Sequence, residues 1–195
     1  DQVEVTLEAD NDPKPDEASA EVVASSVFPP LALVHVRHLT VGFQTAPDAT
    51  ALIQGLWYTA ESLYTSTDEL NTAFSKGDER LVRLKTEEII NQIVGNADTS
   101  QYKDWNEDGT VNDPSDGFGL LHNGDSGHTD QGYIALAISH ANFAAQAADA
   151  TEGIKTNSAS LVTCGENMTG WTEQLLNKAL QLQEMPFGAE MKPVI

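Results

Sequence analysis

The sequence has little positive charge, a single cysteine and no long apolar run. Ten lysine and arginine residues stand against 30 aspartate and glutamate residues, which gives a formal net charge of −20. Because this field repels the phosphate backbone of nucleic acids, we expect no nucleic-acid partner. One cysteine, Cys164, cannot form an intrachain disulfide or a cysteine-based zinc or iron–sulfur site.

The absence of a long apolar run bears on location. No stretch of about 18 consecutive apolar residues occurs, so we predict no transmembrane helix. The sequence begins at Asp1 rather than at methionine, which is consistent with removal of a secretion signal. The acidic composition also favours the extracellular space, where calcium is abundant enough to fill weak sites. We therefore expect a secreted or cell-surface protein.

Residues 1–27 form an acidic segment with eight acids against Lys14 alone. Within it, Val3, Val5 and Leu7 alternate with polar residues, which is the period of a β-strand with one apolar face. A single strand needs a partner. We therefore predict an extended arm that self-associates with another copy of the chain through these three residues.

The remainder of the chain shows helical periodicity, because apolar residues recur three and four positions apart. The segment 31–43 fits either a short helix or a buried strand, and we interpret it as a helix. Longer helices are predicted at about 48–75 with Asp48 as the N-cap, at 78–94, from about Asp130 to Ala148, and at about 158–185.

These patterns predict an all-α protein. Four long amphipathic helices with mostly short connections indicate an antiparallel four-helix bundle, covered by the short N-terminal helix. The bundle is expected to span residues 28–185, with the acidic extended arm at 1–27 before it. An extended C-terminal tail at 186–195 follows it and is expected to support self-association too.

Other reactive side chains have ordinary interpretations. Cys164 falls on the apolar stripe of the last predicted helix, so we interpret it as a small buried hydrophobe. Glu61, Glu87 and Glu88 lack the Glu-x-x-His pairs of di-metal bundles and are interpreted as a solvated face. Nucleophile-elbow, P-loop, dinucleotide-binding and His-Glu-x-x-His motifs are absent from the sequence. We therefore predict that the protein is not an enzyme.

One long polar connection carries a metal-binding pattern. Oxygen-bearing side chains alternate at Asp104, Asn106 and Asp108, followed by Gly109 and the aliphatic Val111. This spacing lets a backbone wrap a hard cation, and the glycine permits the positive φ of the turn. Residues 104–116 resemble the calcium loop of EF-hands and, in their cadence, that of dockerins.

The resemblance implies a set of Ca²⁺ ligands and one departure from the pattern. The position of the closing bidentate acid holds Ser115, and a bulge at Pro114 would bring Asp116 into that role. Without a cation, the crowded acids of this connection would repel one another. The predicted calcium-site residues are Asp104, Asn106, Asp108, Thr110, Asn112, Asp113 and Asp116.

His35 and His38 suggest a different site. They are three residues apart and share one face of the predicted helix, so they could ligate haem or a transition metal inside a bundle. No acidic partner for them on another helix is identifiable in the sequence. Covalent haem is excluded because no Cys-x-x-Cys-His motif occurs.

The favoured hypothesis is a secreted calcium-binding structural protein, a subunit of an extracellular filament or surface assembly. The alternative is a haem or transition-metal carrier that uses His35 and His38. A dockerin-like adhesion module is a third hypothesis, although dockerins use two calcium loops in a shorter chain. The order of helices and motifs, including residues 116–121 and 164–171, resembles uncharacterised secreted bundle proteins of environmental bacteria, which implies no activity.

Overall fold

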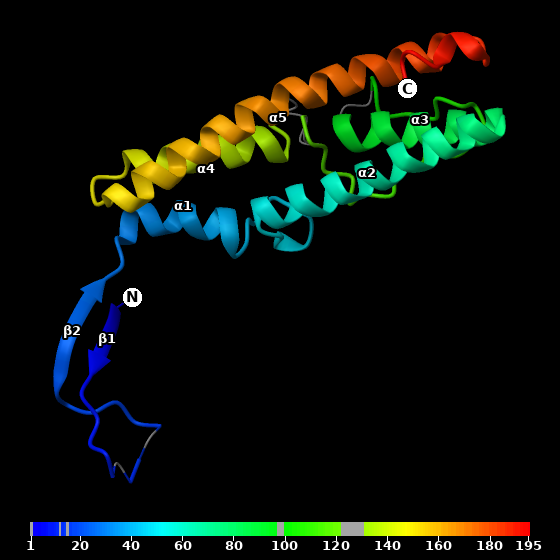
Figure 1. The fold of residues 1–195 in the computed structure, drawn as a ribbon. Coiled ribbons are helices and arrows are strands. Elements are labelled where there is room, and N and C mark those ends of the chain that lie inside the picture. Colours follow the sequence, from blue (N-terminus) through cyan, green and yellow to red (C-terminus); the bar gives the residue numbers. More distant parts are fainter. Residues whose placement is uncertain (1, 12, 15, 97–99, 122–130) are drawn as a thin grey trace.

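The computed structural model describes residues 2–11, 13–14, 16–96, 100–121 and 131–195. Within these residues the regular structure is mostly helical, with one small sheet (Figure 1). The strands are β1 (Gln2–Thr6) and β2 (Val22–Val27), and the helices are α1 (Pro30–Thr40), α2 (Leu52–Lys76), α3 (Glu79–Val94), α4 (Tyr133–Gln146) and α5 (Glu152–Glu184). Short 3₁₀ turns lie at Pro47–Ala49 and Ala189–Met191. The helical prediction for the body of the chain is confirmed.

Local residues explain the boundary between α2 and α3. Gly77 ends α2 in the left-handed conformation with φ of 74°, which glycine adopts without strain. Asp78 then caps α3 by accepting a hydrogen bond from the Leu81 N–H at 3.1 Å. The predicted N-cap at Asp48 is wrong. Asp48 has a φ of 53° inside a 3₁₀ turn, so α2 starts only at Leu52.

The helices form three layers (Figure 1). α1 and α2 follow one another along one side, and α5 runs along the opposite side. The shorter helices α4 and α3 lie between them, with α4 in contact with α1 and α5, and α3 in contact with α2 and α5. Because α3 and α4 each cover only part of the long helices, the arrangement is not a strict four-helix bundle.

Two hydrophobic clusters correspond to the two ends of this arrangement. At one end, α1, α4 and the start of α2 bury a small cluster that contains Leu39, Leu52, Tyr133 and Ala141. At the other end, α3 is almost enclosed by α2 and α5. The larger cluster there contains Leu70, Val82, Ile90, Ile93, Val94, Leu176, Leu182 and Met191.

The strand predicted around Val3 and Val5 finds its partner within the chain. β1 and β2 pair antiparallel, with Val3 opposite Ser26 and Val5 opposite Ala24. This hairpin projects away from the helices (Figure 1). The arm is thus not a lone strand, because the second strand satisfies one of its edges.

The C-terminal residues also differ from the predicted extended tail. Met191 is fully buried, and Phe187, Val194 and Ile195 pack against the larger cluster. The Lys178 Nζ donates a hydrogen bond to the Val194 carbonyl at 3.2 Å. The tail therefore folds back onto its own helices, because its apolar side chains pack against the larger hydrophobic cluster.

The prediction that Cys164 is buried is wrong, because this thiol is exposed. The residues of α5 that face the core are instead Ser158, Gly165, Thr172, Leu176, Ala179 and Leu182. A Cβ at Gly165 would overlap the Ile138 side chain, so the small residue is what lets α5 approach α4. Among the described residues, no helix is at once long enough and apolar enough to cross a bilayer.

Candidate metal centre

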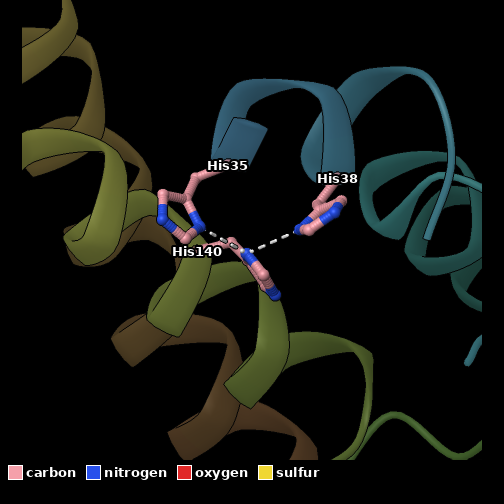
Figure 2. A group of neighbouring side chains, drawn as sticks. All are labelled: His35, His38 and His140. Atoms are coloured by element: carbon pink, nitrogen blue, oxygen red, sulfur yellow. Dashed lines mark hydrogen bonds between the residues drawn. The ribbon is translucent and has the colours of Figure 1, made fainter. Parts of the chain in front are cut away.

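Three histidines from two helices converge between α1 and α4 (Figure 2). α1 supplies His35 and His38, one turn apart, and α4 supplies His140. The Nδ1 atom of His140 lies 3.2 Å from Nδ1 of His35 and 3.3 Å from Nδ1 of His38. One ligand atom from each ring lies within 4.8 Å of the other two. The sequence indicated the first two residues and missed His140.

The contact between α1 and α4 has two other supports. Ala32 on α1 and Ala141 on α4 are fully buried, and their small side chains permit close approach of the helices. Asp149, just beyond α4, accepts hydrogen bonds from the N–H groups of Leu31 at 2.7 Å and Ala32 at 3.0 Å. This carboxylate satisfies the free donors at the start of α1 and holds it beside α4.

Aromatic rings surround the histidines. The ring of Phe143 lies 5.2 Å from His35 and 5.8 Å from His140, and the ring of Phe43 lies 5.1 Å from His140. His140 is only 8% exposed, while His35 and His38 are half-buried. The site is therefore partly shielded from water by apolar groups.

Burial keeps two of the rings neutral. It lowers the pKa of His140 to about 4, with a further contribution from the positive charges that His38 and His35 can carry. The pKa of His38 is also lowered, first by burial and then by His35. Neutral imidazole is the form that binds metal ions, so the lowered pKa of each ring favours its metal-binding form.

Two of the three nitrogen–nitrogen distances match the edges of a coordination shell. Zinc–nitrogen bonds of about 2.0–2.1 Å at tetrahedral angles place neighbouring nitrogens about 3.4 Å apart. The two distances to His140, 3.2 and 3.3 Å, are close to this edge. A neutral imidazole nitrogen is either a donor or an acceptor, so Nδ1 of His140 cannot serve both contacts equally well. A cation at the centre would engage all three lone pairs.

The predicted calcium loop folds into a compact turn. The Asp104 carboxylate accepts hydrogen bonds from the N–H groups of Asp108 at 3.2 Å and Gly109 at 2.8 Å. Asn106 Oδ1 accepts from the Asp108 N–H at 2.9 Å, and Asp108 Oδ1 accepts from the Thr110 N–H at 3.0 Å. Gly109 has a φ of 93°, the positive value expected for it.

The remaining predicted calcium ligands have other partners. Asp113 Oδ1 accepts hydrogen bonds from the N–H and hydroxyl of Ser115. Asp116 accepts from the Phe118 N–H at 2.9 Å and from the Tyr133 hydroxyl at 2.6 Å. Among the described residues, the histidine, cysteine and acidic side chains that converge closely enough to hold a metal ion are His35, His38 and His140. Calcium binding stays a prediction.

Two glutamates of α3 were misassigned from the sequence. Glu87 is fully buried rather than solvated, and its carboxylate accepts hydrogen bonds from the N–H groups of Trp105 at 3.0 Å, Asn106 at 3.1 Å and Asn112 at 2.6 Å. Glu88 is also buried and accepts from the Ser66 hydroxyl at 2.8 Å. The solvated-face interpretation fails because α3 lies in the middle layer.

Asn91, one turn after Glu87, holds the same loop. Its side-chain amide donates to the carbonyls of Lys103 at 3.1 Å and Asn112 at 2.9 Å, and its Oδ1 accepts from the Lys103 N–H at 3.2 Å. The loop is thus positioned by buried side chains of α3.

Known proteins add no assignment to this site. Comparison of the chain with family models, curated proteins and solved structures finds no match. The resemblance of residues 104–116 to EF-hand and dockerin loops is therefore neither supported nor opposed by a relative. Function has to be inferred from the side chains that the structure brings together.

Proposed function

We propose that this protein binds one first-row transition-metal ion, with Zn²⁺ as the best fit, through His35, His38 and His140. The observation that carries the proposal is the pair of Nδ1–Nδ1 distances at His140, 3.2 and 3.3 Å. With one ligand atom of each ring within 4.8 Å of the other two, the three imidazoles form the donor set that zinc, copper, nickel and iron prefer. A hard cation such as Ca²⁺ prefers oxygen ligands and does not suit this site.

The geometry favours a bare ion over haem. A haem iron has four positions occupied by the porphyrin, which leaves only two axial positions for protein ligands. Axial nitrogens on opposite faces of a porphyrin are about 4 Å apart, whereas Nδ1 of His140 lies 3.2 and 3.3 Å from its two neighbours, and a third histidine has no position on the iron. Of the alternatives raised by His35 and His38, transition-metal binding is therefore the one we propose.

Zinc titration of the chelator-stripped protein tests this proposal. A competition assay with a chromophoric chelator should give one high-affinity site per chain. His140→Ala and His38→Ala, which remove ligands from different helices, should each weaken binding by more than about 100-fold, because even loss of a supporting partner costs about 10–100-fold.

The matched control is Gln146→Ala, an exposed substitution at the end of α4. It should leave zinc affinity unchanged. Circular dichroism of each variant establishes that the helices remain. Wild-type affinity in both histidine variants would overturn the proposal, as would the absence of a high-affinity site in the wild-type chain.

The sequence hypothesis of a calcium-binding structural subunit is the second candidate. The observation that favours it is the turn in which Asp104, Asn106 and Asp108 face the same few N–H groups around Gly109. With calcium bound, chelator should lower the melting temperature, and Asp108→Ala should imitate the chelator. Asp68→Ala, an exposed substitution on α2, is the control. An unchanged melting temperature in both tests would discard the site.

Self-association through the hairpin belongs to this second candidate. Val3, Val5 and Leu7 are 50%, 55% and 56% exposed, and an isolated two-stranded hairpin is only marginally stable in water. Pairing of its edge with the hairpin of another copy would extend the sheet, and packing of the apolar faces against each other would cover these side chains. We propose a secreted or cell-surface location for such an assembly, in keeping with the acidic composition.

Light scattering of the full chain across a concentration series tests the assembly. Because each copy carries a net charge of −20, association should strengthen with added salt or divalent cations. Val5→Lys should reduce the average mass, whereas Tyr64→Lys, at an exposed position of α2, should not. A chain that stays monomeric at high concentration and high salt would rule out the assembly.

A further inference from the structure

We infer that the metal ion in the His35, His38 and His140 site binds a small monovalent anion as its exchangeable fourth ligand. This inference rests on the proposed transition-metal site. It adds a ligand class, represented by azide, thiocyanate and bicarbonate, that binds directly to the ion.

The protein supplies three ligands to the ion. A tetrahedral ion held by three histidines has one position left, whereas structural zinc sites fill all four with protein groups. Across the described ranges of the chain, the converging group consists of the three histidines alone, with no thiolate or carboxylate joining it. The fourth position is therefore available to a ligand from solution.

The charge of the ion favours an anionic ligand. Three neutral imidazoles leave both positive charges of a divalent ion uncompensated. His140 is 8% exposed and His35 and His38 are half-buried, so water solvates the site only in part and an unbalanced charge there is costly. Asp149, which lies near the start of α1, already accepts hydrogen bonds from Leu31 and Ala32. An anionic fourth ligand reduces the charge imbalance at the ion itself.

The aromatic rings of Phe143 and Phe43 form one wall of the site. Phe143 meets His140 edge to face, with ring planes at 88°, and Phe43 meets His140 at 69°. Apolar rings offer no set of hydrogen-bond donors for a polyanion, and the net charge of −20 repels multivalent anions most. Small monovalent anions fit both conditions.

Cobalt substitution tests the inference. Co²⁺ loaded into the chelator-stripped full chain should give the intense visible bands of a four-coordinate site. Azide and thiocyanate, added separately at constant ionic strength, should shift these bands and saturate at one anion per cobalt. Inorganic phosphate at the same concentration should produce a smaller shift.

A variant of the wall separates direct binding from bulk salt effects. Phe143→Ala should change azide affinity by a larger factor than cobalt affinity, whereas Gln146→Ala should change neither. Cobalt bands that ignore saturating azide and thiocyanate would overturn the anion inference and leave the metal site standing. A chain that gives no cobalt bands would overturn the proposed function itself.

Discussion

The buried carboxylate of Glu87 accepts a 2.6 Å hydrogen bond from the backbone N–H of Asn112, 25 residues further along the chain. The same carboxylate also accepts from the N–H groups of Trp105 and Asn106. Its charge is thus stabilised by backbone donors of the loop, with the side-chain amide of Asn112 as a further donor at 3.2 Å. This relationship ties the position of the loop to α3.

Glu87→Gln should destabilise the protein. The amide group of glutamine would turn an N–H donor toward loop N–H groups, and at least one buried donor would lose its acceptor. The expected loss is about 1–3 kcal/mol in the free energy of unfolding, measured by urea denaturation. Glu61→Gln, at an exposed position of α2, is the matched control and should have little effect. Equal stability of the two variants would contradict this account of the loop.

Metal binding should occur through Nδ1 in all three ligands. Figure 2 shows these atoms turned toward one another. An ion bound at Nδ1 fixes the proton of each neutral ring on Nε2. Nitrogen-15 NMR of the zinc-loaded protein should therefore show three of the five histidines in the Nε2–H form, and these signals should be changed in His140→Ala. Coordination through Nε2 would show that the rings rotate on loading.

The two glycines Gly55 and Gly170 should respond oppositely to alanine. A Cβ at Gly55 would overlap the ring of Tyr133, so Gly55→Ala should cost about 1–3 kcal/mol of stability through overpacking. A Cβ at Gly170 meets nothing within 4 Å, so Gly170→Ala on α5 should stabilise by up to about 1 kcal/mol through helix propensity. Thermal unfolding measures both. A destabilising Gly170→Ala would be the unexpected outcome.

The stability of the protein should depend on alkaline pH because Tyr102 is partly buried. Burial, with the nearby charge of Asp113, raises the pKa of Tyr102 to about 12, and burial with the hydrogen bond to Asp116 raises the pKa of Tyr133 further. The unfolded chain ionises tyrosine near pH 10, so folding stability should fall as pH rises from about 10 towards 12. Tyr102→Phe should weaken this dependence and remove one late-ionising group from the ultraviolet titration. An unchanged titration would mean that Tyr102 ionises in contact with water.

The sequence predicted the parts of the fold that local residues determine. The boundary between α2 and α3 follows from Gly77, which ends α2, and from Asp78, which caps α3, and the predicted helix ends at 75 and 78 each lie within one residue of the observed ends. β2 was missed because its residues, Val22–Val27, do not alternate between apolar and polar. The layering was missed because the lengths of α3 and α4 relative to α5 depend on where each helix packs, and periodicity does not contain that information.

The sequence indicated two of the three residues of the candidate metal site. His35 and His38 are one helical turn apart, and this spacing is readable in the sequence. His140 lies 102 residues after His38, and only the contact between α1 and α4 brings the rings together. One signal was available: His140 interrupts a series of small buried residues that includes Ala137 and Ala141. A titratable side chain on such a face needs a partner from another helix.

The hairpin is joined to the helices only through Phe28 and Pro29, which connect β2 directly to α1. The orientation of α1 therefore sets the direction in which the hairpin projects. An ion shared between His35, His38 and His140 would lock α1 against its neighbour and so stiffen the base of the projecting segment. Metal binding would then also reduce the motion of the hairpin tip, well away from the ion.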